Sequence, residues 1–556
     1  VPIITMGPRG GGPVIDADAL FIGNATKLFG PTVRVQDQQL VKIVKAKSFS
    51  KNAEMAFEVV AAGVGGGFSV SGPVVLNGGT LTLRSLGFSA FPTLVLNGGV
   101  LNVTGGYSLP LNGILQGSGG VSSRVVTANG STIIATGPLS LGGTNHTNGV
   151  TMEGDLFTGA NAVTLNSLAP ATLGAITTLN NGTIAAANGV FVGGGRVVTG
   201  AGTISGRVAT ANGSIIEAVG TLTLGDPASP IGFAAAGELR TGANTVTLLD
   251  SNQAALGALT TLGTGVADGT LTAAKGLYVD FADNITGRGV IDTPNLLVKA
   301  LTNNGTINGN SILNPITING YAKGIGQYSN VVFNGTYSPG LSPAAVVSLG
   351  DLMMGSGSVL EMELAGLQPG TQYDTLDIAG TATIAGDIVV RGLNGFIPLP
   401  GKQFDMLSFG SLVGDPDVLN GTEFAGLWFD VLREANSLSI RPRAIDGDAS
   451  LDGVVDLDDF TRLAPAFGMI STWTSGDFNY DGVTDLDDFT TLALNFGRSL
   501  PAEVARGSSV PEPAASLLAL ACIGRRRRQV ERRAIEADRM VNRTRTLSSA
   551  AWPSAS

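Results

Sequence analysis

Cysteine and histidine are almost absent from this sequence of 556 residues. Cys522 is the only cysteine and His146 the only histidine. The chain therefore has no internal disulfide framework and no zinc site built from cysteine and histidine. Charged residues make up only 14% of the chain, and no apolar run reaches the roughly 18 residues that an ordinary transmembrane helix needs.

Positive charge is scarce as well. The net charge is −10, and residues 446–500 alone carry −9, from eleven carboxylates and two arginines. Residues 1–445 carry −6, and only the segment after Leu500 is basic, with +5. A nucleic-acid-binding surface needs a basic face. None exists before the tail, so we expect no nucleic acid as partner.

Glycine is abundant, with 80 residues, and the mean hydropathy is positive. Two segments repeat at an offset of 20 residues, VVLNGGTLTL at Val74–Leu83 and LVLNGGVLNV at Leu94–Val103. Apolar and polar residues alternate around an Asn-Gly-Gly turn, which is the pattern of half-buried strands joined at tight corners. We therefore predict that Asn97-Gly98 and Asn129-Gly130 form corners, while Leu94, Leu96 and Leu101 point inward.

A longer repeat overlies the short one. Arg124–Gly142 recurs as Arg207–Gly225 at an offset of 83 residues, and the segment from Gly182 recurs from Gly269 at 87. A unit of this length divides into about four turns of 20 residues, and such repeats form solenoids whose units bury their apolar faces against neighbours. The prediction is a mainly β fold, a right-handed parallel β-helix over residues 65–340.

Residues 341–444 are expected to be the β-rich C-terminal part that caps the solenoid, because an open end would expose unpaired strand edges. The repeats resemble those of autotransporter passengers and adhesins.

Residues 1–64 have no motif and are expected to be the remnant of a region whose true start is missing, with one helix or hairpin at Val33–Phe57. The chain begins at Val1 without a charged-then-apolar leader, so a signal peptide is expected upstream of it.

Residues 445–500 hold an acidic loop twice, GDASLDGVVDLDDF from Gly447 and GDFNYDGVTDLDDF from Gly476. Oxygen side chains occupy loop positions 1, 3, 5, 9 and 12 in both copies, glycine occupies position 6, and valine at position 7 offers a carbonyl. This is the ligand pattern that Ca²⁺ prefers, a wrapping loop followed by a carboxylate in the first turn of a helix. The predicted ligands of two Ca²⁺ ions are Asp448, Ser450, Asp452, Val454, Asp456 and Asp459, and Asp477, Asn479, Asp481, Val483, Asp485 and Asp488.

The duplicated loop resembles the type I dockerin, a small α-helical calcium module of two loop-helix repeats. The resemblance implies docking to a cohesin-like partner. Positions 10 and 11 read Leu-Asp in both copies instead of the usual small hydroxyl pair that helps to choose the cohesin. Pro465 is expected to shorten the first helix. The apolar residues expected to pack the two helices together are Phe460, Leu463, Phe467, Phe489, Leu492 and Phe496.

Residues 501–556 are expected to be a linker, a sorting signal and a basic tail. Val510-Pro511-Glu512-Pro513 precedes a short apolar stretch and the four arginines Arg525–Arg528. These parts resemble a PEP-CTERM signal, with Pro511, Glu512 and Pro513 as its motif, and imply an exosortase-type processing enzyme as partner. The apolar stretch is only about ten residues long, and 28 residues follow the arginines.

Catalytic residues are not apparent in the repeats. β-Helix polysaccharide lyases and hydrolases need clustered carboxylates with basic residues nearby. Here the acids are isolated, as in Glu153/Asp155 and Asp280/Asp283, and His146 lies in a polar loop. We therefore expect no enzyme activity.

The leading hypothesis is a secreted or cell-surface structural or adhesin-like β-solenoid with a calcium-dependent dockerin-like docking module and a C-terminal sorting signal. An extracellular polysaccharide is a further candidate partner. The alternative is a dockerin-bearing polysaccharide-active enzyme of a cellulosome-like assembly. A third hypothesis is an extracellular matrix or envelope protein whose only specific chemistry is calcium binding.

Overall fold

The computed structural model describes residues 87–500, apart from 342, 349 and 425, and before residue 87 chiefly the strands β1–β7. The chain divides into two compact units. Unit 1 comprises Val1–Val418 and Phe429–Arg443, and unit 2 comprises Leu419–Trp428 and Ala444–Ser556. The predicted sorting motif, Pro511, Glu512 and Pro513, lies outside the described residues, as does the basic tail.

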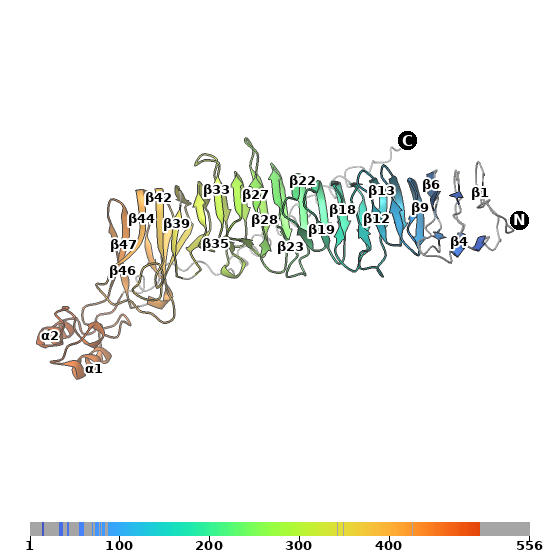
Figure 1. The fold of residues 1–556 in the computed structure, drawn as a ribbon. Helices are drawn as coiled ribbons and strands as arrows, with labels where there is room; N and C mark the ends of the chain where they lie inside the picture. Colours follow the sequence, from blue (N-terminus) through green and yellow to red (C-terminus); the bar gives the residue numbers. More distant parts are fainter. Residues whose placement is uncertain are drawn as a thin grey trace, which may run out of the picture. The chain divides into compact units, whose positions relative to one another are not determined.

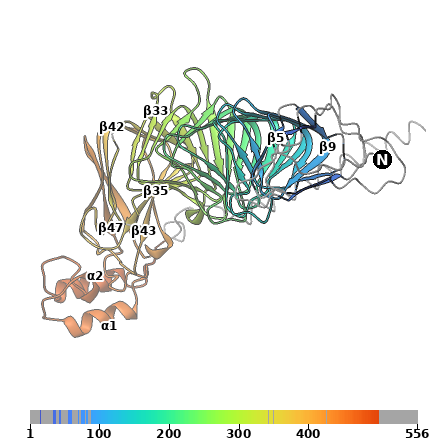
Figure 2. The same ribbon diagram turned by 45° about the vertical axis from the view of Figure 1, so that its right-hand side comes forward.

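Unit 1 is a right-handed parallel β-helix, as the repeats predicted. Its strands form two sheets that run the length of the stack, sheet A with one short strand per turn and sheet B with the rest. In Figure 1 the sheet A strands β23 and β35 are labelled along the lower edge of the stack, and the sheet B strands β22 and β27 along the upper edge. Figure 2 shows the same turns lying one behind another.

Sheet A consists of 19 strands. They are β1 Val14–Ile15, β3 Lys42–Ile43, β5 Ser69–Val70, β8 Ser89–Ala90, β10 Tyr107–Leu109, β12 Val125–Thr127, β14 Val150–Thr151, β17 Ala171–Thr172, β19 Val190–Val192, β21 Val208–Thr210, β23 Phe233–Ala234, β26 Ala254–Ala255, β29 Leu277–Val279, β32 Leu301–Asn303, β35 Tyr321–Gly324, β38 Thr336–Pro339, β41 Val359–Leu364, β43 Asp387–Gly392 and β45 Val418–Asn420.

The first half of sheet B includes several long strands that bend at a corner. Its strands are β2 Val33–Gln36, β4 Met55–Val60, β6 Pro73–Leu76, β7 Thr80–Leu83, β9 Thr93–Val103, β11 Ile114–Val121, β13 Thr132–Leu141, β15 Asp155–Gly159, β16 Ala162–Leu165, β18 Ile176–Ala185, β20 Val197–Ser205, β22 Ile215–Gly225, β24 Glu238–Gly242 and β25 Thr245–Leu249.

The second half of sheet B continues to the end of unit 1. Its strands are β27 Leu259–Leu262, β28 Gly269–Ala273, β30 Asn284–Gly287, β31 Gly289–Asp292, β33 Thr306–Gly309, β34 Ile316–Asn319, β36 Gln327–Ser329, β37 Val331–Phe333, β39 Ala345–Ser348, β40 Leu352–Met354, β42 Thr375–Ile384, β44 Phe404–Val413, β46 Trp428–Arg433 and β47 Ser437–Arg443.

The alternation seen in the sequence decides which side chains fill the core. In β9 every second residue is buried on each side of the corner, and Leu94, Leu96 and Leu101 are fully buried. Gly98 and Gly130 have φ of +80° and +75° and are exposed, as are Asn97 and Asn129. The prediction of inward leucines and Asn-Gly corners is therefore confirmed.

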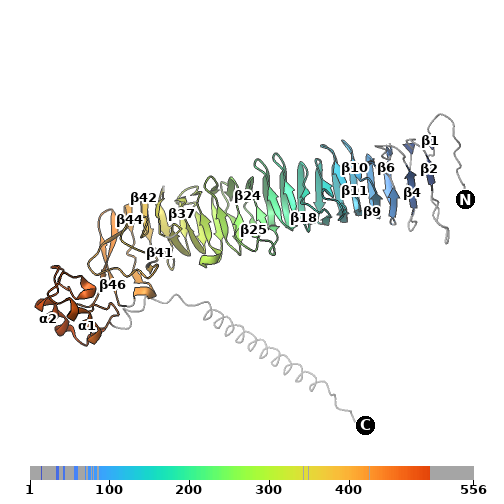
Figure 3. The ribbon, with the colours of Figure 1, turned by 60° about the horizontal axis from the view of Figure 1, so that its bottom comes forward.

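The long repeat corresponds to four turns of the helix. Strand β12, in the first copy, pairs through β14, β17 and β19 with β21, its counterpart 83 residues later. Each copy also bends its long sheet B strand at a corner. The first half of β13 pairs with β15 and the second half with β16, whereas β11 and β20 shift register at glycines. Figure 3 shows β10 and β11 among the stacked turns from another side.

Two features of unit 1 differ from simple stacking or from expectation. Among the described strand pairs, only β44 and β47 are antiparallel, at the C-terminal end of sheet B. The helix or hairpin expected at Val33–Phe57 is wrong: β2 and β4 are parallel neighbours in sheet B, so these two strands belong to the stack. The lysines between them had obscured the strand pattern.

Unit 2 contains the described helices, α1 Leu457–Ala466 and α2 Leu486–Asn495. Two short 3₁₀ helices, η2 Thr422–Phe424 and η3 Trp473–Ser475, belong to this unit, while η1 Leu297–Lys299 belongs to the solenoid. Pro465 does not shorten α1, which has ten residues like α2. The proline is the penultimate residue of the helix, so its missing N–H costs only the bond to the Thr461 carbonyl.

Among the described residues, no helix has the length and apolarity needed to cross a lipid bilayer.

Candidate metal-binding loops

Both acidic loops have the same backbone turn. Gly453 and Gly482, at position 6, have φ of +87° and +93°, as the sequence predicted. Position 4 is also left-handed in both copies, with φ of +61° at Leu451 and +63° at Tyr480. These two non-glycine positions were not predicted, because neither residue type favours that conformation.

The carboxylate at position 1 closes each turn. Asp448 Oδ2 accepts the amide of Gly453 at 2.9 Å, and Asp477 Oδ2 accepts the amide of Gly482 at 3.1 Å. Asp448 Oδ1 also accepts the Leu451 amide and the Ser450 hydroxyl, at 2.7 and 3.1 Å. The position 1 side chain is therefore fixed beneath the loop, and it is almost completely buried in both copies.

The carboxylate at position 12 joins each helix to its loop. Asp459 accepts the amides of Ser450 and Asp456, both at 2.8 Å. In the second copy Asp488 accepts the amides of Phe478 and Asp485, at 2.8 and 2.9 Å. Position 9, Asp456 or Asp485, is the N-cap residue, and positions 9 and 12 form a reciprocal capping box. The residues expected as ligands thus also start the helices.

The remaining predicted ligands lie nearer the surface. Asp452 and Asp481, at position 5, are exposed and accept the amides of Val454 and Val483, at 2.9 and 3.0 Å. Asn479, at position 3, accepts the Asp481 amide through Oδ1 at 2.8 Å and donates to its carboxylate at 3.0 Å. Val454 and Val483 form single β-bridges with Ser499 and Ile470.

Carboxylates are buried here without a compensating side-chain cation. Asp448, Asp459, Asp477 and Asp488 have at most 4% of their surface exposed. Within the described residues, no ion pair joins an arginine to any of them, and Arg498 donates to Asn495 instead. Burying a carboxylate is costly unless amides or a cation balance it.

The electrostatics of position 1 reflect this burial. The pKa of Asp448 is raised, chiefly by burial and then by the charge of Asp459, although the amides of Gly453 and Leu451 lower it. The pKa of Asp477 is raised by burial and by the charges of Asp488 and Asp481, against the amides of Gly482 and Tyr480. Asp477 Oδ1 is buried and makes no hydrogen bond in the described part of the chain.

The side chains of both loops are of the types that bind a cation through oxygen atoms. Their present positions, however, do not form a closed ligand shell. In the part of the chain that the structure describes, no three Asp, Glu, His or Cys side chains converge as metal ligands. The carboxylates at positions 5 and 9 instead accept loop amides. Each carboxylate oxygen at positions 5 and 9 keeps a lone pair that could accept a further contact. Small rotations of these side chains would therefore allow them to bind a cation. The buried Oδ1 of Asp477 supports this fit.

Trp473 links the two loops and was not predicted as a functional residue. Its Nε1 donates to the carbonyl oxygen of Asp448 at 2.7 Å. Its ring lies 5.3 Å from that of Phe478 and 5.4 Å from that of Tyr480, both in the second loop. The available signal was its position, as the one tryptophan between the two copies.

The predicted helix packing is only partly correct. Leu463 and Leu492 are buried, and the rings of Phe460 and Phe489 meet edge to face at 6.1 Å. Phe467 and Phe496 are instead 50% and 56% exposed. Both are C-cap residues with extended ψ angles, so the chain leaves the helix there and carries the rings away from the helix pair.

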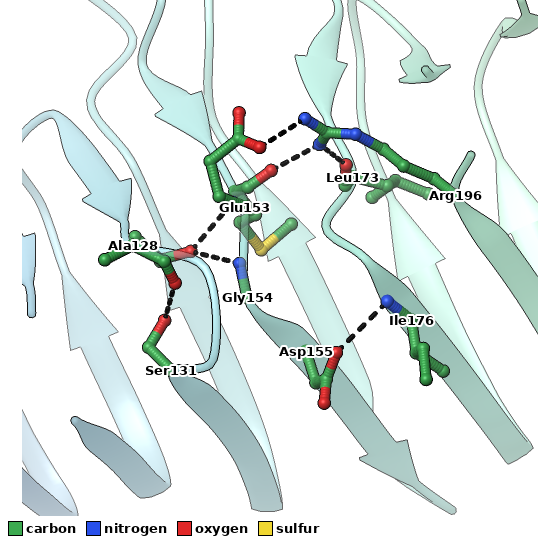
Figure 4. Close-up of polar contacts among 10 residues, drawn as sticks. Ala128, Ser131, Glu153, Gly154, Asp155, Leu173, Ile176 and Arg196 are labelled. Carbon is green, nitrogen blue, oxygen red and sulfur yellow. Dashed lines mark hydrogen bonds and ion pairs between the residues drawn. The ribbon is translucent and has the colours of Figure 1, made fainter. Parts of the chain in front are cut away.

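The acids singled out in the solenoid have structural partners. Glu153 forms an ion pair with Arg196 at 2.7 Å, and Asp155 accepts the amide of Ile176 at 3.1 Å (Figure 4). Arg196 also donates to the carbonyl of Leu173. Asp280 and Asp283 lie in one turn, which is closed by a hydrogen bond from the Asp280 amide to Asp283 Oδ2 at 3.2 Å. His146 lies in a surface turn.

One acidic hollow at the C-terminal end of unit 1 was not predicted. It has a volume of about 480 Å³, and its lining includes Asp377, Asp405 and Glu434. Ser439 donates to Asp405 at 2.7 Å, and the hydroxyl of Ser439 and the amide of Gln403 lower the pKa of Asp405. These acids come from segments far apart in the sequence, so no local motif announces them.

Comparison of the chain with protein-family models, with curated proteins and with solved structures gives no match.

Proposed function

We propose that this protein is a secreted or cell-surface, adhesin-like structural solenoid that attaches to a partner through a calcium-dependent, dockerin-like module. The observation that carries the proposal is the duplicated loop with its buried carboxylates. Both copies repeat the same hydrogen bonds at positions 1, 9 and 12. A repeated β-solenoid is a suitable scaffold for display, because each turn adds length and surface without a new core.

The loop residues have defined roles in this proposal. Asp448, Ser450, Asp452, Val454 and Asp459 would hold one Ca²⁺ ion, with Asp456 assisting. Asp477, Asn479, Asp481, Val483 and Asp488 would hold the other, with Asp485 assisting. Bound Ca²⁺ supplies positive charge that offsets the repulsion between the carboxylates. Asp459 and Asp488 then fix the first turn of α1 and α2 and so set the surface that the helices offer a partner.

A cohesin-like protein is the proposed partner. The test uses a recombinant type I cohesin module as the probe against the intact chain, in Ca²⁺ and in EDTA. We expect binding in Ca²⁺ only, lost in Asp448→Ala/Asp477→Ala and kept in the control Asp446→Ala, an exposed acid outside both loops. Binding that persists in EDTA, or no binding in Ca²⁺, would overturn the docking proposal.

The proposed C-terminal sorting signal has its own test. Replacing Pro511, Glu512 and Pro513 together by alanine is expected to leave export intact and to stop C-terminal processing by an exosortase-type enzyme. The readout is the mass of the C-terminal peptide recovered from the cell surface. An unchanged mass and unchanged surface attachment would remove the sorting signal from the proposal.

The acidic hollow is the one observation that favours the alternative, a polysaccharide-active enzyme. Acid catalysis of glycoside cleavage needs a carboxyl group whose pKa is raised, whereas the pKa of Asp405 is lowered. We therefore expect the intact chain to release no sugars from pectin, glucan or xylan. Release that Glu434→Gln abolishes would favour the enzyme instead.

A further inference from the structure

Lysine is rare in the middle of the solenoid. Between residues 52 and 401 the sequence has three lysines, Lys275, Lys299 and Lys323, at intervals of 24 residues. Other basic residues in this stretch are arginines, scattered over the turns. These intervals are close to the length of one turn here, which takes 24 residues from β29 to β32 and 21 from β32 to β35.

The structure places these lysines on three successive turns of sheet A. Lys275 precedes β29, Lys299 ends η1 before β32, and Lys323 lies in β35. The strands are in parallel register, with Tyr278 opposite Thr302 and Thr302 opposite Lys323. Lys275 and Lys299 therefore occupy matching positions before their strands, whereas Lys323 lies three residues further along, in register with Thr302. Neighbouring strands are about 4.8 Å apart, so the three lysines are spread over neighbouring turns of one face.

All three lysines line a groove of about 630 Å³. Its floor is ordered: Gln253 Nε2 donates to the Ala300 carbonyl at 2.7 Å and to the Thr302 hydroxyl at 2.8 Å. The half-buried ring of Tyr278 also lines it. On one side Leu297 and Val298 of η1 expose 54% and 84% of their surface. The groove therefore combines positive charge, fixed polar groups and apolar contact area.

The three lysines form no ion pair in the described part of the chain. Every ion pair found there uses an arginine, such as Arg196, Arg240 or Arg288. Lys299 and Lys323 are half-buried, which makes an unpaired ammonium group more costly than it would be in open solvent. Asp280 accepts the Tyr278 hydroxyl at 3.3 Å, and Glu361 accepts the hydroxyl of Tyr321 at 2.7 Å. An unbalanced cationic groove on a net acidic solenoid is suited to an anionic ligand.

We propose that this groove binds a carboxylated polysaccharide whose chain lies along the solenoid axis. One carboxylate per sugar gives a row of charges at a spacing comparable to that of the turns, and Tyr278, Leu297 and Val298 offer surfaces for the sugar rings. Double-stranded DNA carries a charge every 1.7 Å or so and needs a wide basic face, which three lysines do not provide. The inference goes beyond the proposed function, because it concerns unit 1 and requires no Ca²⁺.

The test titrates oligogalacturonate into the intact chain by calorimetry, in EDTA so that the acidic loops are not involved. We expect binding that weakens as salt is added, because the attraction is electrostatic. Each of Lys275→Ala, Lys299→Ala and Lys323→Ala is expected to weaken it roughly two- to fivefold, and the triple variant to abolish it. Lys402→Ala, which removes an exposed lysine of a different turn, is the matched control.

Three results would overturn the proposal. These are equal affinity of wild type and triple variant, the same affinity for neutral dextran, and tighter binding of single-stranded DNA or of anionic lipid vesicles than of oligogalacturonate. Circular dichroism of the triple variant separates lost binding from lost folding. Because the titration is done in EDTA, failure of the calcium module leaves its outcome unchanged, and failure here leaves the docking proposal intact.

Discussion

At the scale of single residues, three Gly-X-Gly corners are among the tightest backbone positions of the solenoid. They begin at Gly117, Gly200 and Gly287, at offsets of 83 and 87 residues, and so belong to the long repeat. All six glycines have φ between +113° and +138°. A β-carbon at Gly117 would lie 1.8 Å from the carbonyl oxygen of Leu96 in the next turn. These corners require glycine because the turns are in close contact there.

Gly117→Ala is therefore expected to lower the free energy of unfolding by about 3 kcal/mol or more, through strain and crowding together. Gly98→Ala is the matched control, since Gly98 also has positive φ but an added β-carbon meets nothing within 4 Å. The control is expected to cost roughly 1–2 kcal/mol. Urea unfolding followed by the strand signal measures both, and equal losses would contradict the close-contact explanation.

A second residue-scale prediction concerns Asp374, which is fully buried and accepts the amides of Ala344 and Glu363, both at 2.8 Å. Its pKa is raised to about 7, chiefly by burial and further by the charges of Glu363 and Glu361, against those amides. The folded state then binds a proton more tightly than the unfolded state. The stabilisation is fully present below the ordinary value of 3.8 and is lost as pH rises to about 7.

The difference between wild type and Asp374→Asn isolates this contribution. Wild type is expected to lose up to about 1.4 kcal/mol of unfolding free energy per pH unit across the window, a slope that the variant lacks. Asp405→Asn is the control, because the pKa of Asp405 is lowered and its effect falls at more acidic pH. Denaturant unfolding at several pH values provides the measurement. Parallel pH profiles for wild type and Asp374→Asn would show that Asp374 does not titrate in this range.

At the scale of elements, the sequence predicted the features that follow from the alternation of apolar residues and from the length of the repeat. Alternation in β9 identified Leu94, Leu96 and Leu101 as core residues, and the 83-residue offset gave four turns per unit. The sequence did not predict the direction of the chain at the ends of the helices, nor the side-chain positions that depend on it. Phe467 and Phe496 keep the helical spacing of a packed face, yet both are helix C-caps and are exposed. The acidic hollow and the lysine groove depend on which turns become neighbours.

Trp473 gives a prediction at the element scale, because its ring and Nε1 join the two loops. Trp473→Phe removes the bond to the Asp448 carbonyl and part of a buried ring. We expect it to destabilise the helix pair by about 1–3 kcal/mol. The helix signal in thermal unfolding measures this. Leu494→Ala changes an apolar residue of α2 that is 79% exposed and is expected to have little effect. Similar losses in both variants would contradict the linking role of Trp473.

At the scale of the whole molecule, the chain contains two units whose interiors differ in composition. The solenoid has a continuous apolar core and holds its turns by parallel strand pairing. Unit 2 has a few buried apolar residues around four buried carboxylates. Each of these carboxylates accepts loop amides, and a bound cation would further offset their mutual repulsion. We propose that unit 1 serves display and that unit 2 serves calcium-dependent attachment.

Calorimetric titration of the intact chain with Ca²⁺ tests this account most directly. We expect two ions per chain, one in each single variant Asp448→Ala or Asp477→Ala, and none in the double variant. Asp458→Ala and Asp487→Ala remove exposed carboxylates of the same helices and are expected to keep both ions. Absence of binding heat in wild type, or two ions bound by the double variant, would contradict the account.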